Sequence, residues 1–374
     1  MIASDAQQGF LSVGQEAARA SVLRAFERGR IRRTLLVHGP SGAGKGAFVD
    51  DLLALVFCEA PDRGARPCNA CRGCRDARSR THPDLVTGSP ERWREERGTG
   101  ESIVAAARRW LLESSGAPIR AEQRVLLVEG ADRANEQTQN ALLKALEEPG
   151  PRQLFVLVAD EPSRLLPTIR SRAQALRIGP VAQVQLTEWL MDRWLLPADQ
   201  ARPLAAISHG LIGTAERYVR RKELLEWRRR TQAELLGLLG RGRADRFASV
   251  RDLLDAASRV ASEEAPDVEE APEEETVKVP AAAQRAAAVL LVDAWIDLAR
   301  DMLVTAAGRP SLAPADDLVE RLGPAARRVG VASLTAFVAL LERIREALRQ
   351  NAAPRLALEV AMLAWPQDPP APSA

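Results

Sequence analysis

Eight consecutive residues have the types and the spacing of a phosphate-binding loop. The string GPSGAGKG follows the apolar run Thr34–His38 and precedes the amphipathic run Ala47–Val56, an order that predicts a strand, a glycine-rich turn and a helix. In that context backbone N–H groups and the positive end of a helix bind phosphate oxygens, and the lysine reaches the terminal phosphates. A glycine turn that binds no ligand is the alternative. The candidate nucleotide-binding residues are Gly39, Pro40, Ser41, Gly42, Ala43, Gly44, Lys45 and Gly46.

The loop lacks the side chains that normally serve a magnesium ion. Ser or Thr usually follows the lysine, and its hydroxyl binds the metal, whereas Gly46 and Ala47 follow here. The apolar strand expected over 124–129 ends in Glu129 and Gly130, although an aspartate for magnesium and a glutamate that polarises water are typical there. Glycine cannot act as a base. We therefore expect a loop that can cradle ATP or ADP but is poorly equipped for Mg²⁺ and hydrolysis, with Glu129 either a magnesium contact or a solvated acid.

The four cysteines of the chain lie close together in the sequence. Cys58 precedes the string CNACRGC, which contributes Cys68, Cys71 and Cys74 at Cys-x2-Cys-x2-Cys spacing. In a reducing cytosol such clustering is more typical of metal ligands than of disulfides. Four thiolates form a closed, structural Zn²⁺ site without an open position for catalysis. An iron–sulfur cluster uses the same ligands, and four reduced thiols are the remaining alternative.

Composition sets wide limits on the function. The chain has 374 residues, of which 46% are hydrophobic, enough for two or three domains with sizeable cores. Its formal net charge of +2 gives no overall field for nucleic acid, so any direct DNA contact has to come from a local patch. No apolar run approaches the length of a membrane span, and the N-terminus lacks the order of a signal peptide. We expect a cytoplasmic protein without membrane contact.

Strands and helices alternate in the first half of the chain, which predicts a parallel sheet with helices on both faces. The expected strands cover residues 34–38, 82–86, 124–129, 154–158 and 175–178. The expected helices cover residues 16–28, 47–57, 103–114 and 135–148, with a loop at 88–100 and a basic turn at 168–172. Only helices are expected afterwards, at 186–195, 197–208, 213–239, 247–260, 281–303, 312–322, 334–349 and 354–365.

Changes in composition indicate the domain boundaries. Residues 262–280 form an acidic, proline-punctuated run without apolar periodicity, which cannot bury enough surface to order itself. The expected segments are an α/β domain at 1–179 with the cysteine knuckle at 58–74, a small helical domain at 180–261, the acidic linker at 262–280, a second helical domain at 281–366 and a tail at 367–374.

Short motifs accompany the phosphate loop along most of the chain. They are Val13–Gln15, the four-cysteine knuckle, Ala131–Arg133, Asn140–Pro149 (NALLKALEEP), Leu165–Arg172 (LLPTIRSR) and Asn351–Glu359. Together these motifs resemble those of the bacterial clamp-loader subunits of DNA polymerase III, which belong to the AAA+ class. The resemblance implies a P-loop AAA+ domain with a parallel sheet and an inserted zinc knuckle. A small helical lid domain and an all-α collar domain for oligomerisation would follow it.

Within that family the sequence is most similar to the delta-prime type. The departures at Gly46 and Gly130, together with Ala159 where a sensing Thr is usual, indicate a subunit that is not itself an ATPase motor. No sensor arginine is evident around Gly210–Ala215. By contrast, Arg172 is kept in a Ser-Arg pair. The resemblance implies that this arginine is a finger, supplied in trans to the nucleotide site of a neighbouring ATPase subunit.

The resemblance also implies partners: the gamma/tau ATPase subunits, the delta subunit and the sliding clamp. They would form a hetero-oligomer that loads the clamp on primed DNA during replication, with primer-template DNA contacted through the complex.

Other functions remain open. An active gamma/tau-type ATPase motor would need magnesium held by Glu129 and another base in place of Gly130. A P-loop nucleotide kinase tolerates glycine after the lysine but then supplies a hydroxyl at the next position, where this chain has Ala47. A zinc-dependent scaffold without nucleotide chemistry is a third possibility.

Overall fold

The computed structural model describes residues 9–262, 281–310 and 319–366. They form two compact units: unit 1 comprises residues up to 201 together with 208–215, and unit 2 comprises residues 202–207 and those from 216 onward. Apart from Ser262, the expected acidic linker lies outside the described residues, as do the expected tail and most of the helix expected at 312–322. All candidate site residues belong to unit 1.

Unit 1 contains a five-stranded parallel sheet with the strand order β2-β3-β4-β1-β5. The strands are β1 (Thr34–His38), β2 (Leu85–Gly88), β3 (Arg124–Val128), β4 (Gln153–Ala159) and β5 (Gln174–Arg177). This sheet confirms the α/β P-loop fold expected from the sequence. Because the strands are parallel, their carboxyl ends meet at one edge, and the phosphate loop leaves the sheet there.

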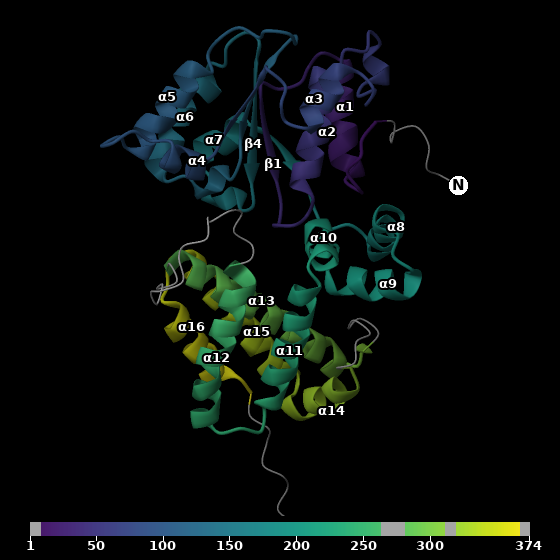
Figure 1. The fold of residues 1–374 in the computed structure, drawn as a ribbon, viewed down its shortest axis with the longest axis vertical. Helices are drawn as coiled ribbons and strands as arrows, with labels where there is room; N and C mark the ends of the chain where they lie inside the picture. Colours follow the sequence, from purple (N-terminus) through teal and green to yellow (C-terminus); the bar gives the residue numbers. More distant parts are fainter. Residues whose placement is uncertain (1–8, 263–280, 311–318, 367–374) are drawn as a thin grey trace, which may run out of the picture. The chain divides into compact units, whose positions relative to one another are not determined.

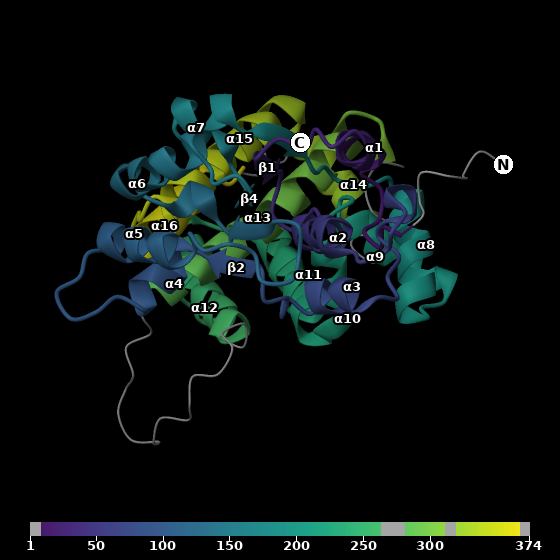
Figure 2. The same cartoon turned by 90° about the horizontal axis from the view of Figure 1, so that it is seen from above.

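Helices cover both faces of the sheet (Figure 1). One face carries α1 (Glu16–Glu27), α2 (Lys45–Phe57) and α3 (Arg72–Arg78), and the other carries α4 (Pro90–Glu95), α5 (Ile103–Glu113), α6 (Glu136–Glu147) and α7 (Pro167–Arg172). Figure 2 shows the same division from above. Successive side chains of a strand point to opposite faces, so Val156 of β4 joins the core under α1 and α2, while Phe155 and Leu157 join the core under α5 and α6.

The loop begins at the centre of this sheet, between two strand ends. Strand β1 pairs with β4 on one side and with β5 on the other. Gly39 N donates to Ala159 O at 3.2 Å, and Ile178 N donates to His38 O at 2.7 Å. A Cβ at Gly39 would lie 1.8 Å from Ile178 O, and φ of Gly39 is +154°. Only glycine tolerates that combination of close approach and backbone conformation.

The loop expected at 88–100 contains a helix, so that prediction was wrong. Helix α4 spans Pro90–Glu95, and Ser89 caps it because its Oγ accepts a hydrogen bond from Arg92 N at 3.1 Å. Pro90 occupies the first helical turn, where its missing N–H costs nothing. The Ser-Pro pair was therefore the sequence signal for a helix start. It was overlooked because the residues around it are charged or glycine, as is typical of a loop.

Three other elements differ from the prediction. Strand β2 begins at Leu85, three residues after the start expected at 82, and the basic turn expected at 168–172 is the short helix α7. The single helix expected at 213–239 is divided into α10 (Ile212–Arg220) and α11 (Lys222–Gly237). The intervening Arg221 has φ of −129° and ψ of 87°. Strong helix formers surround it, so propensity gives no sign of the break.

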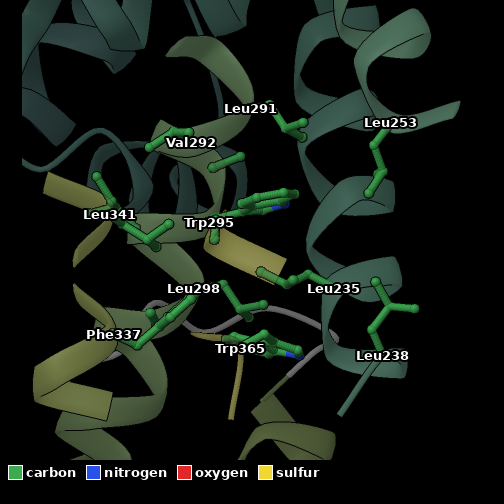
Figure 3. Close-up of a cluster of buried hydrophobic side chains, with 14 of the residues drawn as sticks. Leu235, Leu238, Leu253, Leu291, Val292, Trp295, Leu298, Phe337, Leu341 and Trp365 are labelled. Carbon is green, nitrogen blue, oxygen red and sulfur yellow. The ribbon is translucent and has the colours of Figure 1, made fainter. Parts of the chain in front are cut away.

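The remaining elements are helical, as expected. They are α8 (Gln183–Trp194), α9 (Ala198–Ile207), α12 (Arg243–Ser262), α13 (Ala281–Ala306), α14 (Val319–Val329), α15 (Val331–Arg349) and α16 (Pro354–Ala364). In unit 2, α11 to α16 bury a hydrophobic cluster that includes Trp295 and Leu298 of α13, and Leu298 lies close to Trp365 (Figure 3). The rings of Phe337 and Trp365 lie 4.8 Å apart.

Within the described ranges, no single helix combines the length and apolarity needed to cross a bilayer. One bent pair, Leu322–Val329 followed by Val331–Arg349 at 95°, meets those criteria on length and composition alone.

Candidate phosphate-binding and metal sites

The phosphate loop folds around its lysine. Lys45 is buried at the start of α2, where its Nζ donates to the carbonyl oxygens of Gly39 at 2.8 Å and Pro40 at 2.9 Å. Gly42 and Gly44 have φ of +80° and +92°, a conformation that glycine adopts without strain. The structure therefore brings the eight predicted loop residues into the strand–loop–helix arrangement that favours phosphate binding.

An acid that the sequence reasoning missed also contacts the lysine. Oδ1 of Asp160 lies 2.6 Å from Nζ of Lys45. Oδ2 of Asp132 fixes the Asp160 backbone, because it accepts hydrogen bonds from the N–H groups of Asp160 at 3.1 Å and Glu161 at 2.8 Å. Asp160 follows β4, which is next to β1 in the sheet, and sequence spacing does not reveal that neighbour. This carboxylate competes with any phosphate for Lys45.

Glu129 also lies at this site, and it has an unexpected partner. Oε1 of Glu129 accepts a hydrogen bond from Nη1 of Arg80 at 2.7 Å, and Nε of Arg80 donates to Oδ1 of Asp50 at 2.9 Å. Burial opposes the charge on Arg80, but the contacts with Glu129 and Asp50 raise its pKa above the ordinary value. Burial raises the pKa of Asp50, and Arg80 offsets part of that effect. A guanidinium is thus fixed between two acids beside the loop.

The residues at the expected magnesium position do not fit a divalent cation. Gly46 and Ala47 carry no side-chain oxygen. A Cβ added at Gly46 would have Nη2 of Arg80 as its neighbour at 3.8 Å, so a guanidinium lies in the direction of a Ser or Thr hydroxyl. Glu129 is paired with the same guanidinium. These positions therefore offer Mg²⁺ neither a hydroxyl nor an unpaired carboxylate.

The start of α10 lies on the loop within unit 1. Gly213 N donates to Gly42 O at 2.8 Å, and Oγ1 of Thr214 would lie 3.0 Å from a Cβ at Gly42. The segment 210–215, in which the sequence shows no sensor arginine, therefore contacts the loop through its backbone and small side chains.

The four cysteines form a cluster that fits a zinc ion. The sulfur atoms of Cys58, Cys68, Cys71 and Cys74 all lie within 4.8 Å of one another. Backbone N–H groups donate to three of these sulfurs: Cys68 N to Cys58 at 3.4 Å, Cys71 N to Cys68 at 3.4 Å, and Cys74 N to Cys71 at 3.3 Å. Such donors stabilise thiolates, and the N–H groups of Ala70 and Cys71 lower the pKa of Cys68 to about 6. A tetrahedral zinc site with four thiolate ligands requires this donor set.

The cluster joins α2 to α3. Cys58 follows the last residue of α2, and Cys71 caps α3, its sulfur accepting from Cys74 N. A Cβ at Gly73 would lie 2.0 Å from Phe57 O, so α3 packs directly on the end of α2. Burial raises the pKa of the Cys74 thiol, which lies in this contact. The knuckle therefore packs the start of α3 against the end of α2.

Arg172 contacts residues of α6 and α7 and not the residues of the phosphate loop. It ends α7, where its Nη1 donates to Thr168 O at 3.0 Å and its Nη2 lies 2.7 Å from Oε1 of Glu147. The Arg172 side chain is 39% exposed and that of Glu147 is 44% exposed. Glu147 belongs to the NALLKALEEP motif, but no sequence pattern pairs it with Arg172. The guanidinium is on the surface of unit 1.

Comparison with known proteins identifies relatives. Residues 14–182 match the family described as DNA polymerase III, delta subunit. The delta' subunit of Bacillus subtilis is 31% identical over 193 residues (51% of this chain and 55% of the relative), and that of Escherichia coli is 30% identical over 194 residues (52% and 56%). The gamma/tau subunit of Mycobacterium tuberculosis strain H37Rv is 28% identical over 366 residues, 93% of this chain and 59% of the relative. The chain thus spans little more than half the length of these relatives.

Proposed function

We propose that this chain is a delta'-like subunit of the DNA polymerase III clamp loader, which helps to load the sliding clamp on primed DNA. The match of residues 14–182 to the DNA polymerase III delta family and the similarity to delta' and gamma/tau subunits support this proposal. The state of the nucleotide site carries this proposal. Lys45 and its loop are intact, but Gly46 and Gly130 stand where a motor subunit needs a hydroxyl and an acid. Gly130 has φ of +59°, a conformation in which an acidic side chain would be strained. The subunit therefore holds ATP or ADP without hydrolysing it.

Arg172 supplies the active contribution of this subunit. Its exposed guanidinium, at the end of α7, reaches the nucleotide of a neighbouring ATPase subunit. There it stabilises the negative charge on the phosphoryl group during transfer. Fixed charge of this kind lowers the barrier by several kcal/mol, about 3 kcal/mol for one well-placed donor.

The four-cysteine cluster holds a structural Zn²⁺ ion. All four ligands are thiolates, which leave no open coordination position, so zinc contributes folding free energy and no chemistry of its own.

The partners are the gamma/tau ATPase subunits, the delta subunit and the sliding clamp, in a hetero-oligomer of the bacterial cytoplasm. The helices of residues 281–366 act as its collar, and residues 180–261 act as the lid. Primer-template DNA is contacted through the complex, because the formal net charge of +2 provides no overall attraction for DNA.

An active gamma/tau-type motor is the second candidate, because the gamma/tau match extends over 93% of this chain. Such a motor would need Glu129 to hold magnesium, and Glu129 is paired with Arg80. The delta'-like function is therefore the better supported of the two.

Steady-state ATP hydrolysis tests the proposal. The purified protein, alone and with primed DNA and clamp, should hydrolyse ATP no faster than its Lys45→Ala variant. It should also co-elute with gamma/tau and delta subunits on size exclusion. Robust turnover that depends on Lys45 would replace the delta'-like function with the motor function, and failure to assemble would exclude both.

A further inference from the structure

A guanidinium stands at the place where a P-loop normally has its metal ion. Nη2 of Arg80 is the heavy atom that a Cβ at Gly46 would meet, at 3.8 Å. The Nη1 and Nε groups of the same side chain bind Glu129 and Asp50 at 2.7 Å and 2.9 Å. Arg80 therefore neutralises the acid at the end of β3, as a divalent cation does in a hydrolytic site, and it does so from within the chain.

The cysteine knuckle holds Arg80 in this position. Helix α3 ends at Arg78, and Arg80 follows with φ of +56°, its N–H donating to Ala77 O at 3.1 Å. This left-handed residue ends the helix, and its side chain reaches Asp50 of α2. Because Cys71 and Cys74 anchor α3 to the end of α2, the support of the guanidinium is fixed at its base by the four sulfurs.

One nitrogen of the Arg80 guanidinium, Nη2, is available to bind a ligand. Among the described residues, Nη2 of Arg80 has no hydrogen-bond partner, and the side chain is 31% exposed. Gly46 adds no side chain between it and the loop. A planar guanidinium with N–H donors to spare binds phosphate oxygens well, and a permanently charged one needs no metal to do so.

We propose that Arg80 takes the place of the divalent cation at this loop, so that the phosphates of ATP or ADP bind here without a metal ion. Lys45 and Arg80 then contact the phosphates from the two sides of Gly46, while Glu129 and Asp50 hold Arg80 in place. The inference rests on the proposed nucleotide-binding role of the loop. It adds that the site discriminates against magnesium, because a second cation would lie against a fixed positive charge.

Isothermal titration of the zinc-loaded protein with ATP and ADP tests this role. The buffer is freed of divalent cations with a chelating resin, because EDTA would also compete for the zinc of the knuckle. We expect binding at least as tight without Mg²⁺ as with it. The Arg80→Ala variant should lose roughly 10- to 100-fold in metal-free affinity, the range expected for a hydrogen bond to a charged group, and should regain affinity when Mg²⁺ is added.

Arg94→Ala is the matched control, since it removes an exposed arginine of the same unit and should leave the affinity unchanged. Zinc content and thermal unfolding show that both variants are folded. Binding that requires Mg²⁺, absence of binding in metal-free buffer, or unchanged metal-free affinity of Arg80→Ala would each overturn the inference. Assembly with gamma/tau and delta is measured separately. The delta'-like function can therefore hold when this inference fails, and this inference can hold when the chain does not assemble with those subunits.

Discussion

The guanidinium of Arg172 lies 2.7 Å from the carboxylate of Glu147, which joins the end of α7 to the end of α6. Both side chains are more than a third exposed, and such surface pairs contribute about 1 kcal/mol or less. The pair is therefore strong enough to orient Arg172 in the isolated subunit and weak enough to yield to a phosphate. Glu147 is the group that a neighbouring nucleotide would have to replace.

Replacing Arg172 with Ala should reduce the DNA-stimulated ATP hydrolysis of the reconstituted complex while this subunit folds and assembles normally. A finger stabilises charge that develops only during phosphoryl transfer, and its loss at the site it serves costs about 10³-fold or more in rate. Steady-state turnover of the complex measures this. Arg170→Ala is the control, because it removes another exposed arginine of the same helix, two residues away. Equal turnover in the two variants would exclude the role in trans.

Replacing Cys71 with Ser should release zinc and destabilise unit 1. Cys71 is central to the cluster, since it caps α3 and its sulfur lies 4.0 Å from that of Cys58. Structural zinc sites contribute folding free energy of about 10 kcal/mol in small modules; here the packing of α3 on α2 should retain part of the fold. Metal analysis and thermal unfolding measure the change, with Ser79→Ala as a control that leaves the four thiols intact. A variant with full zinc content would contradict the knuckle.

Replacing Asp160 with Asn should tighten the binding of ADP by about fivefold. The carboxylate of Asp160 now holds Lys45, and a half-exposed ion pair of this kind contributes about 1 kcal/mol. Titration calorimetry of the purified protein measures the affinity, and Asp192→Asn, on exposed surface of α8, controls for the change in net charge. Weaker binding in Asp160→Asn would show that this acid takes part in binding the nucleotide and does not compete with it.

Replacing Asp84 with Asn should destabilise unit 1 by about 2 kcal/mol at neutral pH. The buried carboxylate accepts hydrogen bonds from the N–H groups of Ile119, Arg120 and Ala121 at 2.5, 2.8 and 2.7 Å. Burial alone would raise the pKa of Asp84, but these three donors outweigh it and hold the pKa below the ordinary value of 3.8.

The sign of the pH dependence follows from that depressed pKa. The stabilisation from Asp84 is complete above pH 3.8 and disappears as the pH falls through the lower pKa of the folded state. Denaturant unfolding between pH 3 and pH 7 should show the gap between the parent and Asp84→Asn closing at the acid end. The cysteines protonate in both proteins, so the difference isolates Asp84, and Asp199→Asn serves as an exposed control. If the difference in unfolding free energy between the parent and Asp84→Asn did not change with pH, the stabilisation would not come from the ionised Asp84 carboxylate.

Local patterns in the sequence predicted the P-loop, the cysteine cluster and the α/β fold, because each depends on residues that are near one another in the chain. Arg80 and Asp160 escaped prediction for the opposite reason. Arg80 meets Glu129 across 49 residues, and Asp160 meets Lys45 only because β4 pairs with β1. The break at Arg221 was missed because its neighbours favour helix on both sides. Contacts between residues far apart in the sequence place Arg80 and Asp160, and neither hydrophobic periodicity nor secondary-structure propensity encodes such contacts.

The packing around Gly39 gives a glycine of the loop a structural role that does not depend on a ligand. A Cβ at Gly39 would lie 1.8 Å from the carbonyl oxygen of Ile178, and a Cβ at Gly42 would lie 3.0 Å from Oγ1 and 3.4 Å from N of Thr214. A larger residue at either position would be strained by the positive φ, and at Gly39 it would also displace the carbonyl of Ile178 beside the end of β1. These two glycines are therefore required by the fold whether or not a nucleotide binds, so nucleotide binding has to be tested at Lys45 and Arg80.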